Sequence, residues 1–100
     1  MNCELFKDPE FIKLTREYLE YLQQLLNEIF DDHLPNGNLP KIQKFGHNIK
    51  GTGGGYGFDE FTKVGKKIEF AARDGLLSNL EVILPEFQQM LTEATSKLST

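Results

Sequence analysis

The chain has 100 residues, of which 39% are hydrophobic, so we expect one domain spanning residues 1–100 and built around a single small core. No apolar run reaches the roughly 20 residues that a membrane helix needs, and the N-terminus lacks the pattern of a secretory signal. The lone Cys3 excludes an internal disulfide, and the net charge of −4 argues against nonspecific nucleic-acid binding, so we expect a cytoplasmic protein without nucleic-acid or membrane partners.

The first predicted helix begins at Asp8-Pro9, where Asp8 can cap free amides and proline suits the first helical position. Its apolar residues recur every three or four positions, which is a helical period. They form one stripe at Phe11, Leu14, Tyr18, Leu22, Leu25 and Ile29 and a second at Ile12, Leu19, Leu26 and Phe30. The stretch 31–37 ends this helix with a proline and a glycine. We interpret its Asp31-Asp32-His33 run as a solvated helix end, because residues adjacent in sequence do not converge on one metal ion.

Three further amphipathic helices follow. The second is predicted to begin near residues 38–40, the third to span about 59–73 before an Asp74-Gly75 stop, and the fourth to begin with a Ser78-x-x-Glu81 capping box. Their inward stripes are Leu39, Ile42, Phe45 and Ile49; Phe61, Val64, Ile68 and Ala72; and Leu80, Leu84, Phe87, Leu91, Ala94 and Leu98. Pro85 lies past the first turn, which predicts either a bend just before it or a helix in two pieces. The pattern as a whole predicts an all-α, antiparallel up-down four-helix bundle.

Six of the nine glycines lie between positions 46 and 57, although each glycine inside a helix costs about 1 kcal/mol relative to alanine. One interpretation is a flexible loop, which is most plausible for residues 53–57. A phosphate-binding nucleotide loop fits poorly, because neither G-x-G-x-x-G nor G-x-x-x-x-G-K-S/T occurs and the preceding segment is predicted as helix rather than strand. A third interpretation is a surface cleared of side chains around a histidine.

His47 is the histidine that this third interpretation concerns. On a helix it is one turn from Gln43, Lys50 and Gly51, with Gly54 one turn further on, and the inward stripe leaves His47 facing solvent. Gly51 and Gly54 would leave the imidazole open to another protein, while Lys50 offers a cation to an anion near the ring. Such a face suits a histidine that accepts a phosphoryl group, although an exposed histidine alone is more often an ordinary surface residue.

Two segments resemble the histidine-containing phosphotransfer (HPt) domain family. The run from His47 to Thr52, followed by Tyr56-Gly57-Phe58, is similar to the family's H-x-x-K-G-S/T and L/F/Y-G signature, and the run from Ile68 to Gly75 is similar to the motif that closes its next helix. The resemblance covers roughly residues 39–98. It implies that His47 is the phospho-accepting residue, that Lys50 helps to hold the phosphoryl oxygens, and that Glu69 orients the imidazole. Gly53-Gly54-Gly55 departs from the family, which more often has alanine and serine there.

The resemblance also implies the partners, which are the aspartate-bearing receiver domain of a response regulator, a hybrid sensor kinase, or both. No cofactor is expected in this chain, no metal site is predicted beside His47, and any Mg²⁺ should come with the receiver. The chain is too short for an autonomous kinase. Met1 and the short flanks favour a stand-alone unit over a domain of a hybrid kinase.

The charge distribution favours an anionic partner near His47. Residues 41–73 contain seven lysines and arginines but three acidic residues, a net of +4, whereas the remainder of the chain carries −8. An ordinary mixed surface would also account for this pattern. The alternative function is a non-catalytic helical adaptor that docks a partner through the glycine-rich face.

Overall fold

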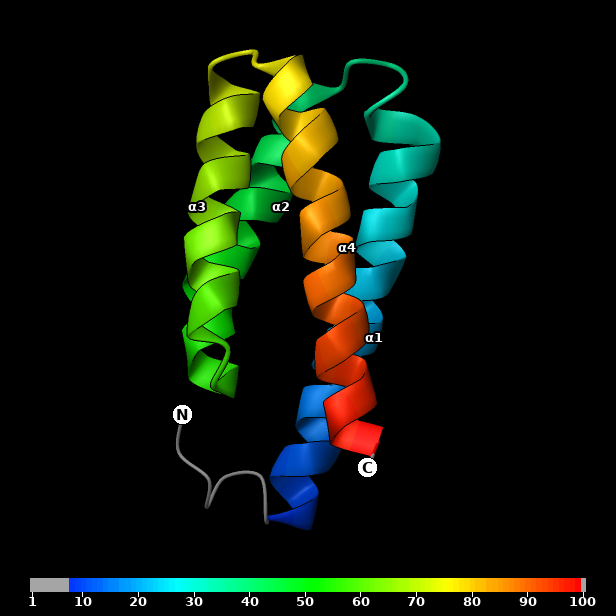
Figure 1. The fold of residues 1–100 in the computed structure, drawn as a ribbon, viewed down its shortest axis with the longest axis vertical. Helices are drawn as coiled ribbons and strands as arrows, with labels where there is room; N and C mark the ends of the chain where they lie inside the picture. The colour runs from blue at the N-terminus through cyan, green and yellow to red at the C-terminus, as the bar shows by residue number, and fades with distance from the viewer. Residues whose placement is uncertain (1–7, 100) are drawn as a thin grey trace.

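The computed structural model describes residues 8–99 as the predicted bundle, in which four helices run alternately up and down (Figure 1). The helices are α1 (Pro9–Glu28), α2 (Leu39–Thr52), α3 (Asp59–Arg73) and α4 (Leu77–Ser99); a π-helical turn, η2 (Ile29–His33), follows α1, and a 3-10 turn, η3 (Gly53–Tyr56), follows α2. The described part of the chain contains no strand. None of its helices has the length and apolar character that a membrane crossing requires.

The core is formed by one apolar stripe from each helix, largely as the helical spacing predicts. Leu22, Ile42, Ile68 and Leu84 are fully buried representatives of the four stripes. The prediction for Leu14 is wrong, because that side chain is 49% exposed.

Thr15 is buried in the core, in place of the neighbouring Leu14. Its hydroxyl donates to the carbonyl of Phe11 at 2.7 Å, so burying it leaves no polar group unpaired. The buried stripe at the start of α1 therefore passes one residue later than hydrophobicity alone indicates.

The predicted start of α1 and the predicted end of α3 are confirmed. Asp8 caps α1, since its side chain accepts from the amide of Glu10 at 3.0 Å and Pro9 follows as the first helical residue. Gly75 ends the α3 segment with a φ of +71°, a left-handed conformation that glycine adopts without strain. Both ends depend on local chemistry, which explains why the sequence identifies them.

The start of α4 differs from the prediction. The helix begins at Leu77, and the amide of Leu80 already bonds to the carbonyl of Leu76, so Ser78 lies inside the first turn and cannot be the capping residue. Pro85 lies within a single continuous helix, so the two-piece alternative is wrong. The bend before Pro85 stays a prediction.

The interfaces between the helices differ in extent, and this difference determines which side of α2, the helix before the glycine-rich segment, is covered. The most extensive interface joins α2 to α3, while α4 packs against both α3 and α1. In Figure 1, α2 and α3 lie against each other along their length at one side of the bundle. One side of α2 is therefore held by α3, and its outer side is left for solvent.

Candidate functional site

His47 is presented to solvent by the second half of α2. Phe45 and Ile49 on either side of it are buried in the core, and the helical rotation between neighbours directs His47 outward. Its side chain is 68% exposed. The imidazole is therefore accessible to another macromolecule without any change in the bundle.

The carboxylate of Glu69, a residue of α3, interacts with both His47 and Lys50. One carboxylate oxygen, Oε2, lies 2.7 Å from Nδ1 of His47, and the other, Oε1, accepts from Nζ of Lys50 at 2.7 Å. The Glu69 side chain is 13% exposed, so it lies beneath the histidine. The structure thus brings together three residues that the sequence analysis singled out, from two helices.

The ammonium group of Lys50 is the main reason that the pKa of Glu69 lies below its usual value, and the hydrogen bond from His47 lowers that pKa further. Partial desolvation opposes both effects. Glu69 is therefore ionised at neutral pH, and an ionised carboxylate only accepts hydrogen bonds. The ring proton of neutral His47 must then sit on Nδ1.

This tautomer leaves Nε2 of His47 with its lone pair. Within residues 8–99 no side chain or backbone group hydrogen-bonds to Nε2. A neutral imidazole nitrogen that is exposed and unprotonated is a nucleophile, and a carboxylate on the opposite nitrogen stabilises the positive charge that develops when it reacts. The arrangement is thus chemically suited to nucleophilic attack by Nε2.

Lys50 lies beside the histidine but is directed at Glu69. Its side chain is 35% exposed, and its ammonium group makes the Glu69 ion pair described above. The geometry links Lys50 to the imidazole through a shared carboxylate. A role in holding phosphoryl oxygens stays a prediction.

The three predicted access positions have different environments. A Cβ atom placed on Gly51 would meet nothing within 4 Å, and on Gly54 it would be 3.7 Å from the Asp59 and Thr62 side chains, an ordinary contact distance. Gln43 is half-buried one turn before His47. Gly51 is therefore open, but Gly54 belongs to the 3-10 turn rather than to the continuous helix that was assumed for it.

The end of the glycine cluster is ordered by aromatic packing. Tyr56 stacks on Tyr18 of α1 with ring centroids 4.1 Å apart and planes 7° apart. The hydroxyl of Thr52 donates to the carbonyl of Asn48, so Tyr18 is the donor in the 2.7 Å bond between its hydroxyl and that of Thr52. These contacts and the 3-10 turn contradict the flexible-loop interpretation for residues 53–56.

Two glycines that the sequence analysis gave no individual role lie directly beneath the site. Gly46 of α2 and Gly65 of α3 are buried where these helices cross, so close together that neither has room for a Cβ atom. The available signal was a glycine in the interior of each helix, where glycine is unfavourable. Pairing them required knowing which helices are neighbours.

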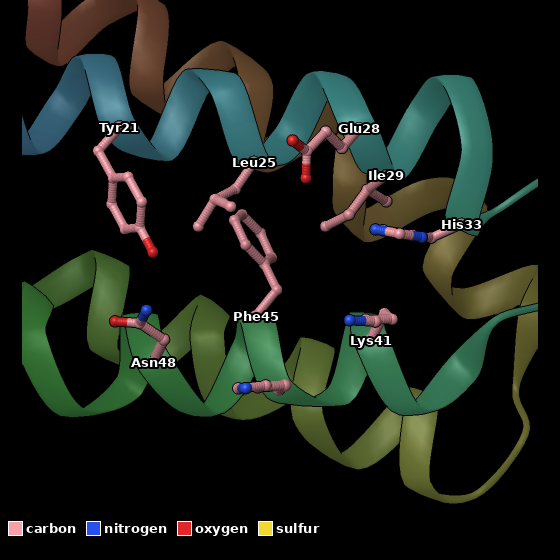
Figure 2. Close-up of a pocket in the computed structure, with 9 residues that line it drawn as sticks. Tyr21, Leu25, Glu28, Ile29, His33, Lys41, Phe45 and Asn48 are labelled. Atoms are coloured by element: carbon pink, nitrogen blue, oxygen red, sulfur yellow. The ribbon is translucent and has the colours of Figure 1, made fainter.

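His33 differs from His47 in every respect that concerns access. Its side chain is 17% exposed, and its Nδ1 is buried without a hydrogen bond, 3.8 Å from Asp32. Figure 2 shows it at one end of a groove between α1 and α2, with its ring directed toward Ile29. The solvated helix end predicted for 31–33 is thus correct for Asp31 and Asp32 but wrong for His33, which the π-helical turn rotates inward.

The groove has a volume of about 210 Å³, and the α2 residues that line it include Asn48, the neighbour of His47 in the sequence. Its α1 wall includes Leu25 and a half-exposed Tyr21, and its α2 wall carries Lys41 and Lys44. Neither lysine forms an ion pair with a described residue. The groove is therefore basic on its α2 wall, whereas its α1 wall combines apolar side chains with the acidic Glu28.

The comparisons with known proteins place the chain in a family. A search of curated proteins finds no match, and a search of solved structures finds none. The family model for the Hpt domain, in contrast, matches residues 10–97, which include α2 and α3 and nearly all of α1 and α4. The match agrees with the helical bundle, and the chain belongs to the Hpt domain family.

Proposed function

We propose that the protein is a phosphotransfer carrier of a multistep phosphorelay, in which His47 takes a phosphoryl group from one receiver-domain aspartate and passes it to another. Hpt domains act in histidine phosphotransfer in general, and they interact with receiver domains and kinases. The observation that carries the proposal for this chain is the exposed His47 imidazole, bonded at Nδ1 to Glu69 and unpartnered at Nε2.

In the proposed step, the Nε2 lone pair attacks the phosphorus of an aspartyl phosphate on the partner. The Nε2–P bond forms, the bond between phosphorus and the carboxylate oxygen breaks, and the partner's aspartate leaves as a carboxylate. The Nδ1 proton stays between His47 and Glu69, and the carboxylate stabilises the cationic phosphoimidazole. We expect any Mg²⁺ that assists the transfer to be held by the receiver.

The surroundings of His47 support a protein partner rather than a small substrate. Gly51 leaves open space next to the ring, and Lys41 and Lys44 provide positive charge on the same helix. Such charges accelerate encounter with an acidic surface, and the effect decreases as salt is added.

The test compares wild type with His47→Gln and His33→Gln, which are the same substitution at the two histidines. A receiver domain is phosphorylated with acetyl phosphate, freed of the reagent and mixed with each protein. Intact-mass measurement at alkaline pH then detects base-stable, acid-labile phosphate. We expect transfer to wild type and His33→Gln and none to His47→Gln, with the circular dichroism of all three unchanged.

Phosphate on His33, or full transfer to His47→Gln, would contradict the assignment. Binding of a panel of phosphorylated receivers without any transfer to wild type would instead support the adaptor function.

A further inference from the structure

The backbones of α2 and α3 touch at Gly46 and Gly65. A Cβ atom on Gly46 would lie 2.5 Å from the amide nitrogen of Glu69 and 2.8 Å from the carbonyl oxygen of Gly65. A Cβ atom on Gly65 would lie 2.6 Å from the amide nitrogen of Lys50 and 2.8 Å from the carbonyl oxygen of Gly46. These neighbours are backbone atoms, which cannot swing aside as a side chain can, so any side chain at either position must push the two helices apart.

This contact involves the residues of the candidate site themselves. Gly46 immediately precedes His47 and faces the backbone of Glu69, and Gly65 faces the backbone of Lys50. The contact between Gly46 and Gly65 therefore sets the distance from the Glu69 backbone to His47 and Lys50. Interhelical distances of 8–10 Å are usual with larger side chains at the contact, and glycines allow a closer approach.

The reach of Glu69 depends on that approach. Its carboxylate is joined to the backbone by two methylene groups and bonds at 2.7 Å to both His47 and Lys50. Hydrogen bonds between such groups have donor–acceptor distances of about 2.7–3.2 Å, and a separation of about 3.6 Å is no longer a hydrogen bond. A separation of the helices by roughly 1 Å would consequently break or weaken both bonds at once.

We propose that Gly46 and Gly65 are positioning residues that act through Glu69: their contact holds α3 close enough to α2 for Glu69 to keep the proton of His47 on Nδ1. The inference builds on the proposed function, since it explains how the nucleophilic state of His47 is maintained. It also separates the glycines of this region into two kinds. Gly51 has open space around it, whereas Gly46 and Gly65 have none.

The experiment measures the tautomer of His47 from the ¹⁵N chemical shifts of its two ring nitrogens at pH about 9, where imidazole is neutral. Wild type should show the proton on Nδ1. In Gly65→Ala and Gly46→Ala the ratio of the two tautomers should change by about tenfold toward Nε2-H, roughly the contribution of one hydrogen bond to a charged group. Gly51→Ala is the matched control, because it adds the same methyl group to the same helix in open space, and it should leave the tautomer unchanged.

A double-mutant cycle with Glu69→Ala distinguishes an action of Gly65 through Glu69 from a merely structural role of Gly65. If Gly65 acts through Glu69, adding Gly65→Ala to Glu69→Ala should change the tautomer no further. If the alanine variants do not fold, Glu69→Asp tests the same point, because it shortens the reach by one methylene group and leaves both glycines in place; it should shift the tautomer as Gly65→Ala does.

An unchanged tautomer in folded Gly65→Ala, an equal shift in the Glu69→Ala background, or an unchanged tautomer in Glu69→Asp would each overturn the inference. Because none of these measurements involves a receiver domain, failure of the phosphotransfer assay alone would contradict the proposed function and leave the positioning role standing.

Discussion

Replacing Gly51 is expected to raise the stability of the protein without raising its rate of phosphotransfer. Gly51 lies in the last turn of α2, its φ is not positive, and a Cβ atom there would meet nothing within 4 Å. Alanine and leucine are both better helix formers than glycine, so each should stabilise the protein by about 0.5–1 kcal/mol. For a domain of this size, that increase corresponds to a rise in Tm of roughly 2–8 °C.

The two substitutions should differ in their effect on transfer. Leucine at position 51 would place a branched side chain one turn from His47, in the space that we expect a receiver to occupy, whereas alanine adds one methyl group. We expect Gly51→Leu to slow transfer from a phosphorylated receiver by at least about tenfold, equivalent to 1.4 kcal/mol in the barrier. Gly51→Ala should stay within about threefold of wild type.

Thermal unfolding and rapid-quench transfer kinetics measure the two effects on the same preparations. A wild-type rate for Gly51→Leu would refute the argument that Gly51 provides access. A lowered Tm for Gly51→Ala would refute the open environment of the residue.

Three further predictions concern the site and its support. Tyr18→Phe removes the hydrogen bond to Thr52 and should lower the free energy of unfolding by about 1 kcal/mol in urea titrations, with an unchanged slope. Lys50→Gln removes the main cause of the lowered pKa of Glu69, so a ¹³C titration of that carboxyl should show its pKa rising toward 4.5. In wild type, the stability that ionised Glu69 contributes is present above pH 4.5 and is lost as the pH falls through the lowered pKa of Glu69. Phe87→Ala removes a fully buried ring packed edge-on against two others and should cost about 3–5 kcal/mol in the same urea titrations, close to global unfolding for a small domain.

Local patterns predicted most of the bundle because local chemistry is sufficient for them. The positions of the buried stripes follow from a helical period, and the ends of α1 and α3 follow from Asp8 and Gly75, which act within one turn of their own backbone. The capping box at Ser78 failed although its sequence pattern was present, since α4 already begins at Leu77, with the carbonyl of Leu76 accepting from the amide of Leu80. A capping motif indicates where a helix can begin, and the packing around it selects among the possible starts.

The histidine face was predicted in the same way, and its chemistry was predicted in part. Spacing alone directs His47 outward and places Lys50 one turn away. It does not say what Lys50 bonds to. The ammonium group could have remained in solvent, and only the neighbouring helix provides the Glu69 carboxylate that holds it at 2.7 Å.

The sequence by itself therefore determined the four helices, their inward faces and the outward direction of His47, because each depends on residues within a few turns of one another. The tertiary structure alone decided that His33 is turned inward by a π-helical turn, that Gly46 meets Gly65, and that one carboxylate serves both His47 and Lys50. The last two features depend on the distance and rotation between helices that are separate in the chain. Both quantities are set by the packing of the whole core, which no single segment encodes.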